Sequence, residues 1–267
     1  MKKIFKAIRN KGINMINKKY KGLIDLSSYK TIDFKKKPAF TLAEVLITLG
    51  IIGIVAAMTI PSLMSAYRKK VIEVRLVKFY TTVNQAIKLA EYDYGEMEGW
   101  DELGSGFEKD ENGNNTQNAK ALPWINKYLV PYIKSDVKKV VTNSNGCVQV
   151  YFPDGSLVAI TGTGWYFFPN ASDYREVEKN DKISIDARQG IKSFGFYFSN
   201  GDCNSLACKY VPKGVQPYKW GWDGTKEMLT TKSDIGCRKD ATHTPAYCTA
   251  LIQMNNWKFP SDYPFKI

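Results

Sequence analysis

The sequence predicts an α+β protein in which one long N-terminal α-helix, apolar in its first half, packs on a C-terminal antiparallel β-sheet. Three observations lead to this prediction: an uncharged run between Glu44 and Arg68, an amphipathic repeat behind it, and alternating apolar runs in the second half of the chain. The 267 residues, 44% of them hydrophobic, suffice for one membrane segment and one folded domain.

The leading segment, residues 1–39, carries most of the positive charge. It holds 12 of the 38 Lys and Arg residues against two acids, so only about +2 of the formal +12 belongs to the rest of the chain. Nucleic-acid binding is therefore not indicated. Because its apolar residues are scattered among lysines, the segment lacks the core of a secretory signal peptide. A cytoplasmic basic tail lying on anionic lipid and a true start at Met15 both stay open.

The run from Val45 to Tyr67 contains no charged residue. As a helix, its roughly 23 residues would extend about 34 Å, which is enough to cross the hydrocarbon core of a bilayer. The gain from its Val, Leu and Ile side chains outweighs the cost of Glu44 near the interface. A helix buried in a soluble core rarely runs this long without a charge, so a membrane segment is predicted. The larger basic total before the run predicts that the leader stays cytoplasmic.

Two residues in this segment are not explained by a simple anchor. Glu44 places a carboxylate at membrane depth, and Pro61 interrupts the backbone hydrogen bonds of a helical pattern. The stretch "PAFTLAEVLITLGIIGIVAAMTIPSL" resembles the class III signal of type IV prepilins and type II secretion pseudopilins. In that signal a basic leader ending in a small residue precedes Phe-Thr-Leu-x-Glu and a hydrophobic helix with a late proline. The resemblance covers residues 36–67.

The resemblance implies that a prepilin peptidase cuts between Ala39 and Phe40, and that Phe40 becomes the N-methylated terminus. It also implies that Glu44, fifth in the mature chain, matches the amine of a neighbouring subunit during assembly, and that Pro61 marks a helix kink. The family usually has glycine before the cut, whereas this chain has Ala39, which is small enough for the same peptidase subsite. The implied partners are other pilin-like subunits in a homo- or hetero-filament, the peptidase, the membrane platform of the assembly machinery and membrane lipid.

An amphipathic stripe continues the helix beyond the apolar run as far as Tyr94 and Gly95, where glycine suits a C-terminal cap. The stripe recurs at helical spacing, and we expect it to pack on a sheet; it comprises Ile72, Leu76, Phe79, Tyr80, Val83, Ile87 and Ala90. The expected organisation is a removed basic leader (1–39), a transmembrane and assembly helix (40–64), its amphipathic continuation (65–95) and a head domain (96–267).

Turn signals and alternation predict the elements of the head domain. The polar, glycine-rich stretch 104–118 is expected to be a loop, and "AKALPWINKYLVPYIK" a short helix broken by Pro123 and Pro131. "CVQVYFPDGSLVAI" predicts a β-hairpin that turns at Asp154-Gly155. "GWYFF" and "SFGFYF" are further expected strands, and "DKISIDARQG" is a weaker one.

Few residues could carry chemistry. The loop residues Asp110, Asn112, Asn114 and Thr116 imitate the first positions of a calcium loop, but the required glycine and the closing glutamate are missing, so no metal is predicted. His243, the single histidine, is expected to be a bystander. No phosphate-binding loop, catalytic triad or usefully spaced carboxylate pair appears. The sequence predicts a protein that is not an enzyme and takes no cofactor.

All five cysteines follow the membrane segment, which favours export of the head domain into an oxidising space. Their spacing does not match a zinc site. Proximity along the chain favours the disulfides Cys203–Cys208 and Cys237–Cys248, leaving Cys147 free or buried at the start of a core strand. About 15 ways exist to choose two bridges among five cysteines, so the connectivity stays open.

These observations and the resemblance predict a structural subunit of a bacterial type IV pilus or type II secretion pseudopilus. The precursor would span the inner membrane once with its head domain outside the cytoplasm, and the mature form would lie in a surface or periplasmic filament. The alternative is a single-pass, membrane-anchored binding domain whose N-terminus only resembles the signal.

Overall fold

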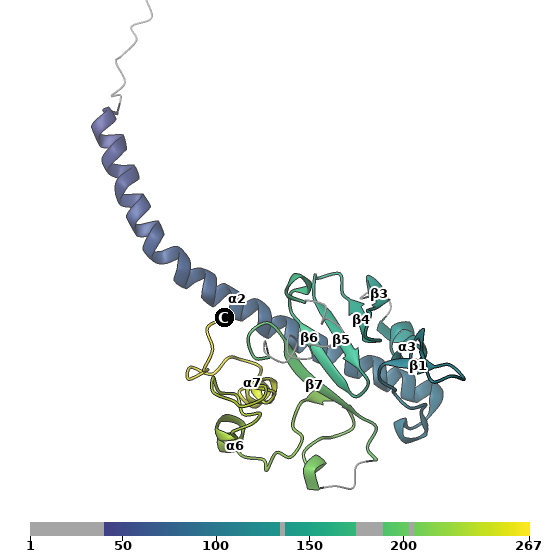
Figure 1. The fold of residues 1–267 in the computed structure, drawn as a ribbon. Helices are drawn as coiled ribbons and strands as arrows, with labels where there is room; N and C mark the ends of the chain where they lie inside the picture. Colours follow the sequence, from purple (N-terminus) through teal and green to yellow (C-terminus); the bar gives the residue numbers. More distant parts are fainter. Residues whose placement is uncertain (1–39, 134–136, 175–188, 203–205) are drawn as a thin grey trace, which may run out of the picture. The chain divides into compact units, whose positions relative to one another are not determined.

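The computed structural model describes residues 40–133, 137–174, 189–202 and 206–267 (Figure 1). The chain divides into two units, Met1–Val55 and Ala56–Ile267, and helix α2 (Leu42–Tyr94) has residues in both. In the second unit a six-stranded antiparallel sheet follows the helix. The predicted α+β class, with a long N-terminal helix and an antiparallel sheet, is confirmed.

Helix α2 contains 53 residues and ends where the sequence predicts. Gly95 follows its last residue, Tyr94, with a φ of +80°, a conformation that costs glycine little because it has no Cβ. The N–H of Gly95 donates to the carbonyl of Glu91 at 2.9 Å and so satisfies one of the last free carbonyls of the helix. Pro61 lies inside the helix and does not end it.

The large sheet is a meander in which the strands lie side by side in chain order, from β3 to β8. The predicted hairpin at Asp154-Gly155 joins the second and third strands, with Val150 opposite Val158. The two aromatic runs form strands as predicted, and they pair with each other, with Trp165 opposite Phe196. The strands are β3 (Lys139–Thr142), β4 (Val148–Tyr151), β5 (Leu157–Thr161), β6 (Gly164–Phe168), β7 (Phe194–Ser199) and β8 (Gly214–Pro217). Of the weaker predicted strand at 181–190, only the last two residues lie within the described part.

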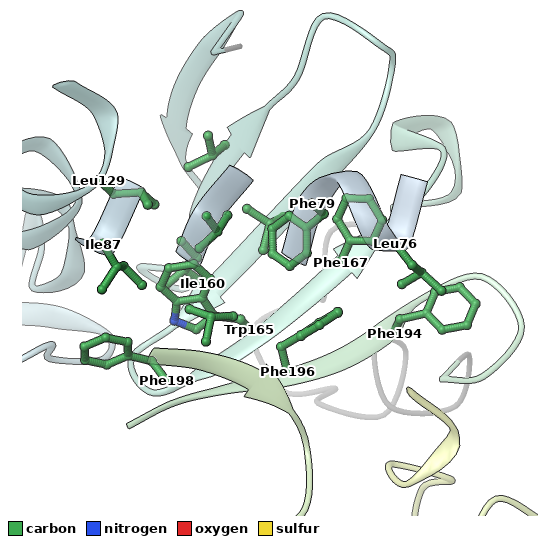
Figure 2. Packing of buried hydrophobic residues seen from close by; sticks show 14 of the residues in the cluster. Leu76, Phe79, Ile87, Leu129, Ile160, Trp165, Phe167, Phe194, Phe196 and Phe198 are labelled. Atoms are coloured by element: carbon green, nitrogen blue, oxygen red, sulfur yellow. The ribbon is translucent and has the colours of Figure 1, made fainter. Parts of the chain in front are cut away.

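The main core lies between α2 and one face of the sheet (Figure 2). Phe79 is at its centre: its ring stacks on that of Phe167 with centroids 4.4 Å apart and meets Phe196 edge-on at 5.0 Å. Five members of the predicted amphipathic stripe are buried in this core: Leu76, Phe79, Val83, Ile87 and Ala90. The other two, Ile72 and Tyr80, are partly buried and pack against the core. The stripe therefore predicts the helix face that contacts the sheet.

Alternation along the strands gives the opposite face of the sheet a second, smaller cluster. In β5, Val158 and Ile160 join the main core, whereas Leu157 and Ala159 point the other way. The smaller cluster comprises Cys147, Leu157, Ala159 and Phe168, with tyrosines packed around it.

The predicted loop at 104–118 is wrong in part, because it contains a two-stranded hairpin, β1 (Phe107–Lys109) and β2 (Asn115–Ala119). The carboxylate of Asp110 organises its turn by accepting the main-chain N–H groups of Asn112 at 2.9 Å and Asn114 at 2.8 Å. Local bonds of this kind stabilise a turn between strands that lack apolar alternation.

The predicted break at Pro123 is also wrong. Pro123 lies in the first turn of α3 (Ala121–Tyr128), where a main-chain N–H would have no helical acceptor, so its absence costs nothing. The chain departs from the helix at Leu129, and Pro131 lies in a separate single turn, α4 (Val130–Ile133).

The C-terminal region forms two short helices, α6 (Lys226–Thr231) and α7 (Cys248–Met254), and α7 packs on β7 and β8. Short 3₁₀ turns occur at Met97–Gly99, Ala171–Asp173 and Leu206–Cys208. The last residues return to α2: the N–H of Phe259 donates to Glu73 Oε1 at 2.9 Å, and Ser65 Oγ donates to the carbonyl of Ile267 at 3.1 Å. The C-terminal residues thereby hold α2 in place between Ser65 and Glu73.

Candidate processing and assembly segment

The first turn of α2 is closed by two side chains that cap each other. Oε2 of Glu44 accepts the main-chain N–H of Thr41 at 2.8 Å and its hydroxyl at 2.9 Å, while the N–H of Glu44 donates to Thr41 Oγ1 at 3.2 Å. This is a capping box, which satisfies donors that the start of a helix leaves without partners. The capping box is not among the features predicted from the sequence, although Thr-x-x-Glu in "FTLAE" is a recognisable signal for it.

The cap explains the orientation of the Glu44 side chain, but it does not explain why this side chain carries a negative charge. Only Oε2 takes part in the cap, and within the described part of the chain no donor reaches Oε1 and no cation forms an ion pair with this carboxylate. A neutral acceptor would serve a helix cap about as well. An unpaired charge at this depth is costly in hydrocarbon, because neither water nor a counter-charge compensates it.

The apolar half of α2 is not buried by the described residues. It is the one helix of the described residues that is long and apolar enough to cross a membrane, and none of its most apolar 18-residue window is buried. Phe40 is 87% exposed, Leu42 77% and Met58 75%. A buried core helix is thereby excluded, and this surface is left for lipid or for other chains.

The structure brings three of the residues from the predicted signal to one helix end. Phe40 immediately precedes the cap, Thr41 forms it, and Glu44 lies one turn inside the helix. Ala39, the residue before the predicted cut, lies outside the described part of the chain. Pro61 is in the same helix and remains exposed.

The head domain contains a disulfide between Cys237 and Cys248, the first residue of α7. Cys147 is free and buried, and its desolvation raises the pKa of its thiol to about 12. It fills the smaller cluster as a small apolar residue. The predicted Cys203–Cys208 bridge involves a residue, Cys203, that lies outside the described part.

The residues weighed for metal binding and catalysis do not gather into a site. Within the described ranges, no three His, Cys, Asp or Glu side chains are placed to share a metal ion. The Asp110 carboxylate is engaged by its own turn. His243 is exposed, and its Nδ1 lies 3.4 Å from the hydroxyl of Thr242.

Comparison with known proteins gives two family matches, which meet near Pro61. Residues 34–60 match the prokaryotic N-terminal methylation motif, and residues 62–267 match a family of unknown function, DUF6613. No curated protein and no solved structure matches the chain significantly. The first match confirms the resemblance that "FTLAE" and the apolar run suggest. The methylation motif followed by a long apolar helix fits a type IV pilin-like protein, and by the match over residues 62–267 the chain belongs to the DUF6613 family.

Proposed function

We propose that this chain is a structural subunit of a type IV pilus or a type II secretion pseudopilus, assembled from the membrane through α2. The observation that carries the proposal is the bare apolar half of that helix, which begins with Phe40, Thr41 and Glu44 in the register of the methylation motif. An anchored binding domain needs the apolar length, but the only use it has for Glu44 is a helix cap that a neutral acceptor could also supply.

Processing supplies the opposite charge that the precursor lacks. A prepilin peptidase cuts the chain between Ala39 and Phe40, removes the basic leader and leaves a new α-amine on Phe40, which is then N-methylated. Glu44 lies four positions after the residue that carries this amine, so every mature subunit carries one positive and one negative group at the same end of α2. Because Oε2 of Glu44 is held in its own cap, Oε1 remains for the amine of a neighbouring subunit.

Assembly exchanges lipid around the helix for the helices of other pilin-like subunits. The exchange costs little free energy, because both environments are apolar. Packing and electrostatic contacts between the helices then determine whether association is favourable. Gly50 and Gly53 lie on this surface with no atom within 4 Å of where a Cβ would stand, so a second helix can approach closely there. The membrane platform of the assembly machinery would act on subunits held in this way.

The proposal places the head domain outside the cytoplasm, with the precursor in the inner membrane and the mature chain in a filament. The disulfide between Cys237 and Cys248 supports this placement, because such bonds persist in oxidising compartments. The proposed boundaries are the leader at 1–39, the transmembrane and assembly helix at 40–64, its continuation at 65–95 and the head at 96–267.

Co-expression with a prepilin peptidase tests the proposal. We expect the full chain to shift to a shorter form when the peptidase is active and to remain intact when the peptidase is inactivated by mutation. Phe40→Asp serves as an uncleavable control, because a charge beside the cut opposes entry of the apolar segment into the peptidase site. A chain that stays full length beside a peptidase that cuts a known prepilin would contradict the proposal.

A further inference from the structure

A hollow of about 500 Å³ opens beside α2 between Tyr67 and Arg75, in the second unit of the chain. Four cationic side chains line it, Arg68, Arg75, Lys192 and Lys266, against one acidic side chain, Asp173. Part of the remaining wall is apolar and is formed by Val71, Ile72 and Ile191. The hollow thus offers excess positive charge beside an apolar wall.

Two of the four cations have structural partners. Lys192 pairs with Asp173 at 2.5 Å, and Arg75 donates to the carbonyls of Pro169 and, at 2.6 Å, Asp154. The bonds of Arg75 hold α2 against the loops after β4 and β6. The Lys192–Asp173 pair joins the loop after β6 to the segment before β7.

The other two cations, Arg68 and Lys266, are exposed, and no carboxylate of the described residues lies within ion-pair distance of either one. Neither charge is therefore held in an ion pair within the described part of the chain, although the main-chain carboxylate of Ile267 also lines the hollow. An anion of suitable size is the natural complement to two such groups at the mouth of one hollow.

The position of Arg68 along α2 indicates how far the hollow lies from the membrane. Arg68 is the first charged residue after Glu44, and large apolar side chains just before it are exposed, with Leu63 69% and Tyr67 64% exposed. Arg68 lies 24 positions after Glu44, a rise of about 36 Å along a helix, which is a few ångströms more than the hydrocarbon thickness of a bilayer. When α2 spans a membrane, Arg68 lies at the depth of the lipid headgroups.

We propose that this hollow binds the phosphate-bearing headgroup of an anionic phospholipid from the membrane that holds α2. Arg68 and Lys266 would bind the phosphate oxygens, since guanidinium and ammonium groups form charge-assisted bonds with phosphate. Val71, Ile72 and Ile191 would contact the glycerol and the first methylenes, and Tyr67 would lie at the interface, where tyrosine is favoured. The headgroup would steady the head domain over the membrane until the subunit leaves it. The inference rests on the anchoring part of the proposed function and not on filament assembly.

The experiment compares the full chain in nanodiscs of phosphatidylcholine alone with the full chain in nanodiscs in which one third of the lipid is phosphatidylglycerol. Tryptophan fluorescence follows thermal unfolding of the head domain. We expect phosphatidylglycerol to raise the midpoint by several degrees, because a ligand that binds only the folded state stabilises it, and we expect added salt to reduce the rise. The double variant Arg68→Gln, Lys266→Gln should unfold normally in phosphatidylcholine and lose most of the rise.

The matched control is Lys69→Gln, Lys70→Gln, which removes the same charge at the same depth but outside the lining of the hollow. It should retain most of the rise. An equal loss in both double variants would show diffuse attraction to the surface and overturn the proposal, as would the absence of any rise in the unmodified chain. Inorganic phosphate added to the chain in detergent should not reproduce the rise at millimolar concentration; if it does, the ligand is free phosphate and the lipid assignment is wrong. Because neither peptidase nor partner subunit is present, failure here leaves the proposed function untouched.

Discussion

Glu44 accepts two hydrogen bonds from Thr41, one from its main-chain N–H at 2.8 Å and one from its hydroxyl at 2.9 Å. The pair caps the start of α2, so Glu44 has a role in folding as well as the role in assembly that we propose. The two roles need different properties of the same side chain. A cap needs an oxygen that accepts hydrogen bonds, whereas pairing with an amine in an apolar environment needs the negative charge.

Glu44→Gln separates the two roles. The amide oxygen can still accept the N–H of Thr41, so we expect membrane insertion and the start of the helix to be retained, and insertion is favoured by the loss of a charge. Incorporation into filaments should fall about tenfold or more, because the amine of the neighbouring subunit loses its counter-charge in low dielectric. Immunoblots of the sheared-filament fraction and the membrane fraction measure the share of the protein that is assembled.

Thr41→Ala is the control for Glu44→Gln. It removes the hydroxyl of the cap, at a cost of about 1 kcal/mol to the end of the helix, and keeps the carboxylate. Its filament yield should stay near that of the unmodified chain. Equal yields from Glu44→Gln and the unmodified chain would show that the charge has no part in assembly.

Phe79→Ala should destabilise the head domain severely. Phe79 joins α2 to two strands through Phe167 and Phe196, and truncating a buried phenylalanine costs about 3–5 kcal/mol. Thermal unfolding of the full chain in detergent should show a clearly lower midpoint. Tyr92→Ala, at a side chain that is 90% exposed, should change stability by less than about 0.5 kcal/mol. Similar shifts for the two variants would contradict the packing described for α2.

The surroundings of Asp154 predict how the stability of the protein changes as the pH falls. Burial alone would raise the pKa of Asp154, but hydrogen bonds from Ser156 and the charges of Lys78 and Arg75 outweigh burial and lower it. A carboxyl whose pKa is lower in the folded state contributes stability above its unfolded pKa, about 3.9, and loses that contribution as pH falls through the folded value. Asp154→Asn should therefore be less stable than the unmodified chain at pH 7, and the gap should close as the pH falls below about 4.

The gap at pH 7 should be modest, at most about 1 kcal/mol, because the Lys78 side chain is 44% exposed and such pairs contribute little. Urea midpoints at pH 7 and pH 3 measure the change. Glu111→Gln, an exposed position in the β1–β2 turn, controls for the general effect of removing an acid. If the stability difference between Asp154→Asn and the unmodified chain is the same at both pH values, the pKa of Asp154 is not lowered in the folded state.

Much of the fold is predictable because two strong periodicities run through the chain. The 3.6-residue spacing from Leu76 to Ala90 identifies the helix face that meets the sheet, and alternation about Asp154-Gly155 identifies a hairpin of the sheet. Both patterns arise because one side of each element is buried and the other is not.

The remaining elements lack such a pattern. Strands β1 and β2 are polar and mostly exposed, so local turn bonds at Asp110 and pairing with each other define them rather than burial. Helix α7 has only seven residues and is almost wholly buried, which leaves no amphipathic signal. The hollow beside Arg68 joins residues from α2, the loop after β6 and the C-terminus, so only the folded structure brings them together.

The N-terminal mass of the protein isolated from cells shows directly whether the chain is processed as a prepilin. We expect assembled protein to begin at Phe40 and to carry one methyl group on its amine, with the peptide that spans Lys37 to Phe40 absent. Recovery of that spanning peptide from assembled protein, or a terminus at any other residue, would contradict the account.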